Sequence, residues 1–262
     1  MATISERLKA IQDQLGVEAD GQLGPQTLSA IEKAVFGKEG HGSPAQAESA
    51  QLGLRLSRSG IEQIVAYEIG SPAYYDKQLQ SPCWPGGQSG VTIGIDYDLG
   101  YASPSQFAED WQPLPDAVKH TLIKVLGLKG HKAKRQIASL RNIKIPYAVA
   151  LDVFTLSSLP SYASKTLKAY PGLDQLHPDA QVALISLVYN RGTSTKGATR
   201  TEMLNLRRCV AEGDYSAMAK NIRSMKRLWV GKGLDGLLKR REHEAHLIET
   251  VTDYGVGELV RL

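Results

Sequence analysis

The polar side chains best suited to chemistry in this sequence lie between residues 68 and 100. Glu68 ends an amphipathic stretch, and a glycine-rich segment that carries Thr92 and Asp98 follows it. Cleavage of a glycosidic bond needs a proton donor on one side of the sugar and a carboxylate or a positioned water on the other. These residues therefore point to a glycoside hydrolase, with Glu68 as the candidate general acid.

The residues before Glu68 suit that role. Ile64, Val65, Ala66 and Tyr67 predict a half-buried setting, in which a carboxyl group holds its proton more strongly because burial disfavours the charged form. The alternative for a single Glu at a helix end is an ordinary solvated side chain.

Two aspartates compete for the second role. Asp96 and Asp98 would point to the same side of a strand if the strand that contains Ile93 continues, and their repulsion would favour the protonated form of one of them. Which of the two serves stays open. The hydroxyl of Thr92 can both donate and accept, which suits holding a water beneath a sugar ring, although a β-branched residue is also typical of strands.

The segment YEIGSPAYYDKQL, continued by SGVTIGIDYDLGY, resembles the phage-type lysozyme (muramidase) superfamily, and more closely its pesticin-like branch. In that branch the hairpin reads T-I-G-x-G-Y-D, with the Asp six residues after the Thr. The resemblance implies that Glu68 protonates the leaving oxygen, that Asp98 activates water or stabilises positive charge at the sugar carbon, and that Thr92 orients the water. The chain departs from the pattern at Asp96, where the family has Gly.

Further residues are candidates for binding the sugar. The segment ALISLVYNRGTS resembles the family's buried helix that ends beside the cleft, so Asn190 and Arg191 are expected to bond sugar hydroxyls or acetamido groups. Trp84 and Tyr97 are expected to stack on sugar faces, with a place in the core as the alternative, and we add Asp96 to this set.

A second segment resembles the family's closing helix. The pattern G-L-x-x-R-R-x-x-E runs from Gly236 through Arg240 and Arg241 to Glu244. The alternative is a surface helix that carries salt bridges.

Residues 1–37 resemble the helical peptidoglycan-binding module found on many wall hydrolases. The residues that carry the match include Asp20, Gly21, Gly24, Pro25 and Thr27. The alternative is an N-terminal helical hairpin packed on the main domain. Residues 38–50 are small and polar and predict a flexible linker, which leaves residues 51–262 as the lysozyme-like catalytic domain.

The predicted fold class is α+β and mainly helical, with a lysozyme-like, two-lobed catalytic domain. Apart from a small β region at residues 84–100, the main domain reads as helices. The helical candidates are residues 103–111, 115–127, 130–140, 146–168, 178–189, 200–212, 214–224 and 233–250.

The bulk composition limits the partners and cofactors. The chain has 262 residues and a net charge of +4, which favours an anionic partner such as a wall polymer without selecting it. No metal or organic cofactor is implied, because His243 and His246 are three residues apart rather than four. We expect no nucleic-acid partner, no membrane insertion, two free thiols at Cys83 and Cys209, and a monomer.

The sequence thus predicts a muramidase that cleaves the β-1,4 bond between N-acetylmuramic acid and N-acetylglucosamine. The alternatives are a lytic transglycosylase and an inactive peptidoglycan-binding protein. Without a recognisable secretory signal, the chain is expected to be made in the cytoplasm and to act in the periplasm or on the wall. It would arrive there as a phage endolysin, or as a secreted antibacterial effector with an immunity protein as partner.

Overall fold

A computed structural model describes residues 4–17, 19–21, 27, 52–251 and 258–262, and the chain divides into two compact units, residues 1–50 and 51–262. The linker predicted at residues 38–50 lies outside the described residues, as do Gly24 and Pro25 of the N-terminal module. Within the described parts, no helix is both long enough and apolar enough to cross a membrane.

In the first unit, one buried glutamine connects the residues expected to form the wall-binding motif. Helix α1 (Ile4–Leu15) carries Gln12, which is 1% exposed. Its amide nitrogen donates to Asp20 Oδ1 at 2.7 Å and to Thr27 Oγ1 at 2.9 Å, and its amide oxygen accepts from the backbone N–H of Gly21 at 2.7 Å. A turn and a later residue are therefore held against one helix, although a binding role for them is untested.

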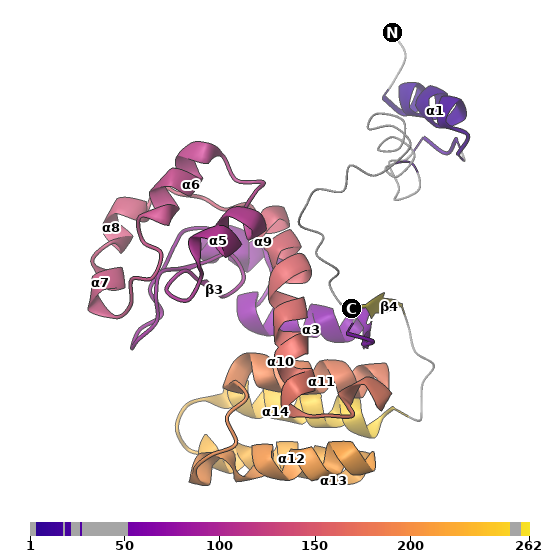
Figure 1. Cartoon of the computed structure of the whole chain (residues 1–262), viewed down its shortest axis with the longest axis vertical. Helices are drawn as coiled ribbons and strands as arrows, with labels where there is room; N and C mark the ends of the chain where they lie inside the picture. The colour runs from indigo at the N-terminus through magenta and orange to yellow at the C-terminus, as the bar shows by residue number, and fades with distance from the viewer. Residues whose placement is uncertain (1–3, 18, 22–26, 28–51, 252–257) are drawn as a thin grey trace. The chain divides into compact units, whose positions relative to one another are not determined.

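The second unit is mainly helical with two small sheets, which confirms the predicted fold class (Figure 1). Its first half contains β1 (Arg55–Ser57), α3 (Arg58–Ile69), α4 (Pro72–Tyr74), the π-helix η1 (Tyr75–Leu79), β2 (Thr92–Ile93), β3 (Tyr97–Asp98), α5 (Pro104–Asp110), α6 (Asp116–Ile123), α7 (His131–Lys134) and α8 (Ile137–Leu140). Its second half contains α9 (Tyr147–Val153), η2 (Phe154–Ser158), α10 (Leu159–Ala169), η3 (Leu173–Gln175), α11 (Pro178–Arg191), η4 (Ala198–Arg200), α12 (Thr201–Glu212), α13 (Tyr215–Ser224), η5 (Met225–Leu228), α14 (Asp235–Glu249) and β4 (Leu259–Arg261).

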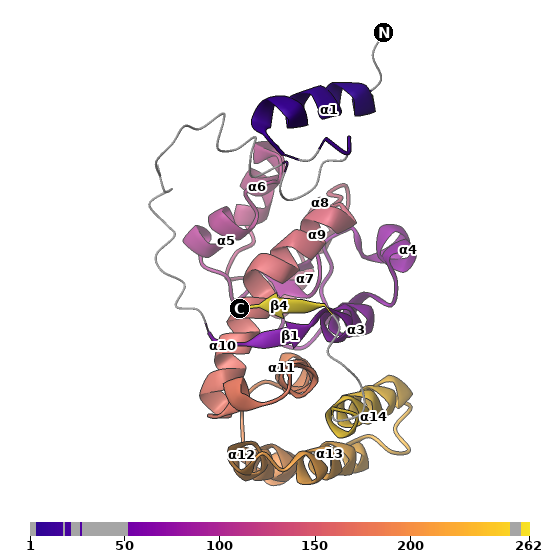
Figure 2. The same ribbon diagram turned by 90° about the vertical axis from the view of Figure 1, so that its right-hand side faces the viewer.

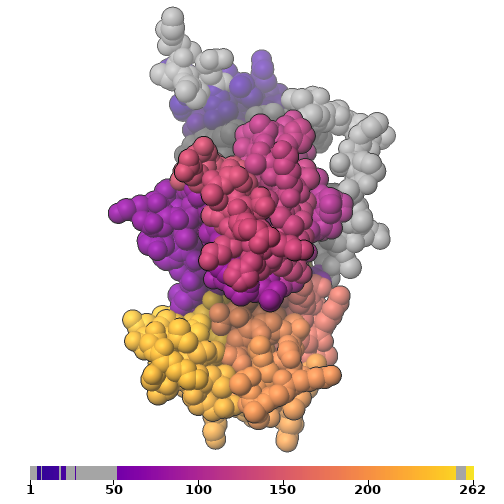
Figure 3. Space-filling model, turned by 90° about the vertical axis from the view of Figure 1, so that its left-hand side faces the viewer, coloured from indigo at the N-terminus to yellow at the C-terminus, as the bar shows by residue number. Residues whose placement is uncertain are grey.

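The helices α11 to α14 form one lobe of this unit, coloured orange to yellow in Figures 1 and 3. Helix α11 is buried on every side from Ala180 to Tyr189, as its almost continuous apolar sequence requires. Helix α14 packs against α11 and α13, and α13 packs against α12.

Helix α3, which carries Glu68, also contacts α11 closely. Gly60 makes this contact possible, because a Cβ atom there would lie 2.2 Å from Val182 Cγ1.

The other lobe contains the hairpin. Strands β2 and β3 pair antiparallel, with Thr92 opposite Asp98 and Ile93 opposite Tyr97, so that residues 94–96 form the turn. Gly94 has φ +60°, and a Cβ atom there would lie 2.7 Å from the buried ring of Trp111. The turn interrupts the strand, so the expectation that Asp96 and Asp98 share one side of a continuing strand is wrong.

A long helical segment connects the two lobes. It runs from α9 through η2 to α10, and the middle five residues are π-helical (Figure 1). The sequence predicted one helix at residues 146–168 and did not anticipate this interruption. Such π segments frequently accompany functional sites.

A second sheet joins the two ends of the unit. Strand β1 pairs antiparallel with β4, with Leu56 opposite Val260, and Figure 2 shows the two strands side by side. The sequence predicted β structure only at residues 84–100, so the pairing of β1 with β4 was not predicted.

Candidate active site

Glu68 lies at the end of α3 and forms an ion pair with an arginine of α14. Its Oε1 is 2.7 Å from Nη1 of Arg240, and the two side chains are 16% and 4% exposed. The ring of Tyr67 covers the guanidinium of Arg240 at 5.0 Å, and the Tyr67 hydroxyl bonds Nδ1 of His243. The half-buried setting expected for Glu68 is therefore present, and a buried cation fixes the direction of its carboxylate.

Arg240 belongs to a buried polar network. Its guanidinium donates to the backbone oxygen of Ser186 at 3.1 Å and to Glu244 Oε1 at 3.3 Å. Glu244 Oε1 also accepts from Ser186 Oγ at 2.6 Å and from Arg241 Nη2 at 2.7 Å. Because Arg240, Arg241 and Glu244 are at most 3% exposed, the alternative of a surface helix with salt bridges is wrong.

Asp98 is engaged with the backbone of its own hairpin. Its Oδ1 accepts from the N–H of Gly90 at 3.0 Å and of Gly100 at 2.8 Å, and its Oδ2 lies 3.1 Å from the N–H of Gly90. A Cβ atom at Gly90 would lie 2.4 Å from Asp98 Oδ1, so a glycine is needed for this approach. Asp98 thereby ties the two ends of the hairpin together.

Asp96 occupies the last position of the hairpin turn. Its φ is +55°, and among the residues that the structure describes it is the one non-glycine with a positive φ. Such a backbone costs on the order of 1 kcal/mol for a residue with a side chain, which explains the glycine of the family pattern at this position. The chain thus keeps a carboxylate where the backbone favours glycine.

The surroundings of Asp96 raise its pKa to about 7, chiefly through loss of water around the carboxyl group and then through the charges of Glu68 and Asp98. Arg240 acts in the opposite direction. The side chain is nevertheless exposed toward the cleft, so part of this effect is screened by solvent. Asp96 is therefore close enough to Glu68 for the charge of Glu68 to raise the pKa of Asp96.

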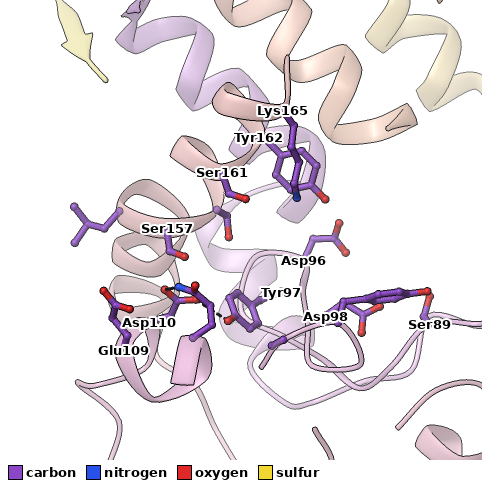
Figure 4. Close-up of a pocket in the computed structure, with 15 residues that line it drawn as sticks. Ser89, Asp96, Tyr97, Asp98, Glu109, Asp110, Ser157, Ser161, Tyr162 and Lys165 are labelled. Atoms are coloured by element: carbon purple, nitrogen blue, oxygen red, sulfur yellow. Dashed lines mark hydrogen bonds between the residues drawn. The ribbon is translucent and has the colours of Figure 1, made fainter. Parts of the chain in front are cut away.

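A cleft of about 790 Å³ lies between the hairpin with α5 on one side and the η2–α10 segment on the other (Figure 4). Its lining is mostly polar and comprises Ser89, Asp96, Tyr97, Asp98, Tyr101, Ala102, Gln106, Glu109, Asp110, Leu156, Ser157, Ser158, Ser161, Tyr162 and Lys165.

Burial raises the pKa of Tyr162 in this cleft, with added contributions from Asp96, Glu68 and Asp98. All three carboxylates therefore lie within electrostatic reach of Tyr162, although only Asp96 and Asp98, and not Glu68, are among the lining residues.

The predicted sugar-stacking residues differ in position. Tyr97 lines the cleft, and its hydroxyl donates to Asp110 Oδ2 at 2.6 Å, while its ring meets Trp111 edge-on at 5.4 Å. Trp84 is not among the lining residues. Its indole N–H donates to the backbone oxygen of Ser89 at 3.1 Å, and its ring lies near His131.

Thr92 is 7% exposed and does not line the cleft either. Its backbone exchanges both hydrogen bonds with Cys83, at 2.8 and 3.0 Å. The threonine thus sits at the centre of the hairpin, with Asp98 directly opposite it on β3.

The structure places Asn190 and Arg191 at the end of α11, and neither lines the cleft. Asn190 is exposed, whereas the Arg191 guanidinium lies 4.8 Å from the ring of Trp229 and donates to the backbone oxygen of Thr199 at 2.6 Å. Burial, followed by the charge of Arg200, lowers the pKa of Arg191 to about 10. These contacts organise the loop after α11.

Sequence reasoning missed the residues that the connecting helix contributes to the cleft, chiefly Ser157, Ser161, Tyr162 and Lys165. The spacing of Ser158, Ser161, Tyr162 and Lys165 along one helix face was the available signal. Arg240 was noted within its motif but was not assigned to the site.

No cluster of three or more potential metal ligands occurs among the residues described, and the thiols of Cys83 and Cys209 are both free. Cys83 as a residue is exposed, but the partial loss of water around its thiol, followed by the charge of Asp96, raises the pKa of that thiol.

Comparison with known proteins identifies a family whose model matches part of the chain. The model of the phage lysozyme family matches residues 147–244, from the start of α9 into α14. No curated protein matches the chain. The matched segment includes Arg240 and Glu244, whereas Glu68, the hairpin and the N-terminal module lie outside it, so the wall-binding assignment of that module stays a prediction. The match supports the resemblance to the phage-type lysozyme superfamily noted on residues 68–100, and it suggests a glycoside hydrolase of the lysozyme type.

Proposed function

We propose that this protein is a muramidase that hydrolyses the β-1,4 bond between N-acetylmuramic acid and N-acetylglucosamine. The observation that carries the proposal is the position of Glu68, held by the buried Arg240 and close to two aspartates of a hairpin that borders a polar cleft. A proton donor within electrostatic reach of the cleft wall and a second carboxylate in that wall match the requirements of glycoside hydrolysis.

In the proposed reaction Glu68 gives its proton to the glycosidic oxygen as the bond from that oxygen to the sugar carbon breaks. A water molecule attacks the carbon from the opposite face, and a hairpin aspartate, Asp96 or Asp98, accepts its proton or stabilises the positive charge. Thr92 is the hydroxyl proposed to orient that water. Its burial and its position opposite Asp98 are compatible with acting from within the hairpin.

The cleft supports a sugar polymer as substrate. Hydroxyl groups of Ser157, Ser161 and Tyr162 face carboxylates and a tyrosine on the other wall, so donors and acceptors are available along its length (Figure 4). Sugar hydroxyls and acetamido groups need such partners, and Tyr97 and Tyr101 add aromatic surface.

The reaction class is tested by the products released from purified sacculi. After borohydride reduction and mass analysis, the proposal predicts muropeptides whose new reducing end is N-acetylmuramic acid. A reducing end at N-acetylglucosamine would contradict the assigned bond, and 1,6-anhydro-muramic acid would identify a lytic transglycosylase. Sacculus binding without release of any product would identify an inactive wall-binding protein.

We further propose that the protein acts in the periplasm or on the wall, as a phage endolysin or as an antibacterial effector neutralised by an immunity protein. Expression in a Gram-negative host tests the site of action. Lysis is expected when the chain is fused to an export signal and not when it stays in the cytoplasm, and Glu68→Gln should abolish it. Lysis that persists with Glu68→Gln would contradict an enzymatic cause.

A further inference from the structure

The hairpin contains two aspartates, and the structure gives them different environments. Asp98 uses both carboxylate oxygens to accept backbone N–H groups of Gly90 and Gly100. Moving this carboxylate would leave the buried N–H groups of Gly90 and Gly100 without these acceptors. The Asp98 carboxylate therefore holds the two ends of the hairpin together.

Asp96 has a different environment. The described hydrogen bonds and ion pairs include none from its carboxylate, and Figure 4 shows the side chain directed into the space below Tyr162. Its backbone is held at φ +55° by a turn in which Gly94 packs on Trp111. Strained positions that the surrounding structure enforces are concentrated at functional sites.

We infer that Asp96, and not Asp98, is the carboxylate that activates the attacking water opposite Glu68, and that Asp98 is a positioning residue that fixes the hairpin carrying it. This inference rests on the proposed muramidase function and assigns one role within it. It differs from what the family resemblance implies, since the resemblance gives this role to Asp98.

Glu68 loses its proton to the glycosidic oxygen, whose bond to C1 of N-acetylmuramic acid breaks with the electron pair passing to that oxygen. The water oxygen forms the new bond to C1 on the other face, and its proton passes to the carboxylate of Asp96. Because one water attacks directly, the product has inverted configuration.

The charges around Asp96 suit a base that works near neutral pH. Glu68 of α3 and Asp98 of β3 raise its proton affinity, whereas Arg240 of α14 lowers it, and the neutral Tyr162 and Tyr189 face it from α10 and α11. The resulting pKa of about 7 is close to the value at which a general base combines ionisation with proton affinity.

The first test compares Asp96→Asn with Asp98→Asn on purified sacculi across a pH range. Asn tolerates a positive φ, so Asp96→Asn should remain folded and lose about 100-fold or more in kcat, together with the limb of the pH profile near pH 7. Asp98→Asn should lower the melting temperature, while its remaining activity keeps that limb. Wild-type kcat in Asp96→Asn would overturn the inference.

The second test uses azide, a nucleophile that needs no base. Asp96→Gly restores the residue that the turn favours and opens space for azide, so sodium azide should restore bond cleavage and yield a glycosyl azide of inverted configuration. Asp98→Asn should show no rescue. Rescue of Asp98→Asn but not of Asp96→Gly would overturn the inference.

The proposed muramidase function and the assignment of Asp96 as the base can be contradicted separately. If wild type releases products and Glu68→Gln does not, but Asp96→Asn stays fully active, only the assignment of Asp96 is wrong. If wild type releases no product from sacculi, the proposed function and this inference both fail.

Discussion

Arg240 Nη1 lies 2.7 Å from Glu68 Oε1 and joins a helix near the end of the domain to a helix near its beginning, 172 residues apart. The same guanidinium contacts Ser186 of α11. Three helices that the chain forms at different places therefore converge on the candidate acid, and the direction of its carboxylate depends on the packing of the helical lobe.

Replacing Arg240 with Lys should reduce activity strongly while keeping the charge. A lysine ammonium cannot span Glu68, Ser186 and Glu244 as the planar guanidinium does, so Glu68 is expected to shift and kcat to fall by about 100-fold. The measurement is kcat and KM on soluble glycan chains, with Lys239→Met on the exposed side of the same helix as the control. Unchanged kcat in Arg240→Lys would show that the pairing does not position the acid.

Removing the charge of Glu244 should destabilise the domain. One carboxylate serves Arg240 and Arg241, so Glu244→Gln leaves Arg240 paired with Glu68 and removes the carboxylate that pairs with the buried Arg241. We expect a loss of about 3–5 kcal/mol in the free energy of unfolding, measured by urea denaturation.

The matched control for this change lies two residues away on the same helix. Glu242 pairs with Arg223 and Lys226 at the surface, so Glu242→Gln should cost about 1 kcal/mol or less. Equal losses for the two variants would contradict the importance of the buried network.

The pH dependence of stability should reveal Asp96. Its pKa is about 7 in the folded protein and 3.8 without perturbation, so the folded state retains a proton that the unfolded chain releases between these values. Wild type should therefore lose stability relative to Asp96→Asn as the pH rises from about 4 to 7. This loss is measured as the difference in melting temperature between the two proteins at each pH.

The exposed Asp116 provides a control for the pH dependence of stability. The hydrogen bond and charge of Lys119 lower the pKa of Asp116, so its contribution has the opposite sign and is lost as the pH falls through that lowered pKa. Asp116→Asn should accordingly show no gain in stability relative to wild type between pH 4 and 7. A pH-independent difference between Asp96→Asn and wild type would mean that Asp96 titrates normally.

Gln12→Ala should separate wall binding from catalysis if the N-terminal unit is a binding module. Removing its amide leaves Asp20, Gly21 and Thr27 without their common partner and disorganises the motif. Because tethering raises local substrate concentration, lysis of whole sacculi should need more protein, while turnover of short soluble glycans stays unchanged. Gln14→Ala, on the exposed side of α1, is the control. An identical dose response for Gln12→Ala and wild type would contradict a binding role.

Local signals were sufficient to predict most helices of the main domain. Proline at residues 104 and 178 marks helix starts, and glycine at 192 and 213 follows helix ends, so those bounds agree with the structure to within a few residues. The π-helical segment at Phe154–Ser158 was not predicted, because one extra residue in a turn barely changes the apolar pattern of a long helix.

Features that depend on distant contacts were not predictable in the same way. Strands β1 and β4 have three residues each and lie about 200 residues apart, too short for a periodic signal. The burial of Arg240 and Arg241 runs against the usual exposure of arginine and follows only from the packing of α14 on α11 and α3.

The two hairpin aspartates illustrate one feature that the sequence predicted and one that it did not. The order of Glu68, Thr92 and Asp98 indicated the reaction class, but the sequence left open whether the strand continues through Asp96. The glycine of the family pattern at this position was a physical signal for a positive φ, and it predicts the turn that the structure shows.

The role of Glu68 as the acid is best tested with purified sacculi treated with wild type, Glu68→Gln and Glu62→Gln, because Glu62 is an exposed glutamate on the same helix. Soluble reducing muropeptides are measured by mass at a temperature where all three proteins are folded. We expect release by wild type and Glu62→Gln and none by Glu68→Gln. Release by Glu68→Gln at the wild-type rate would show that Glu68 is not the acid.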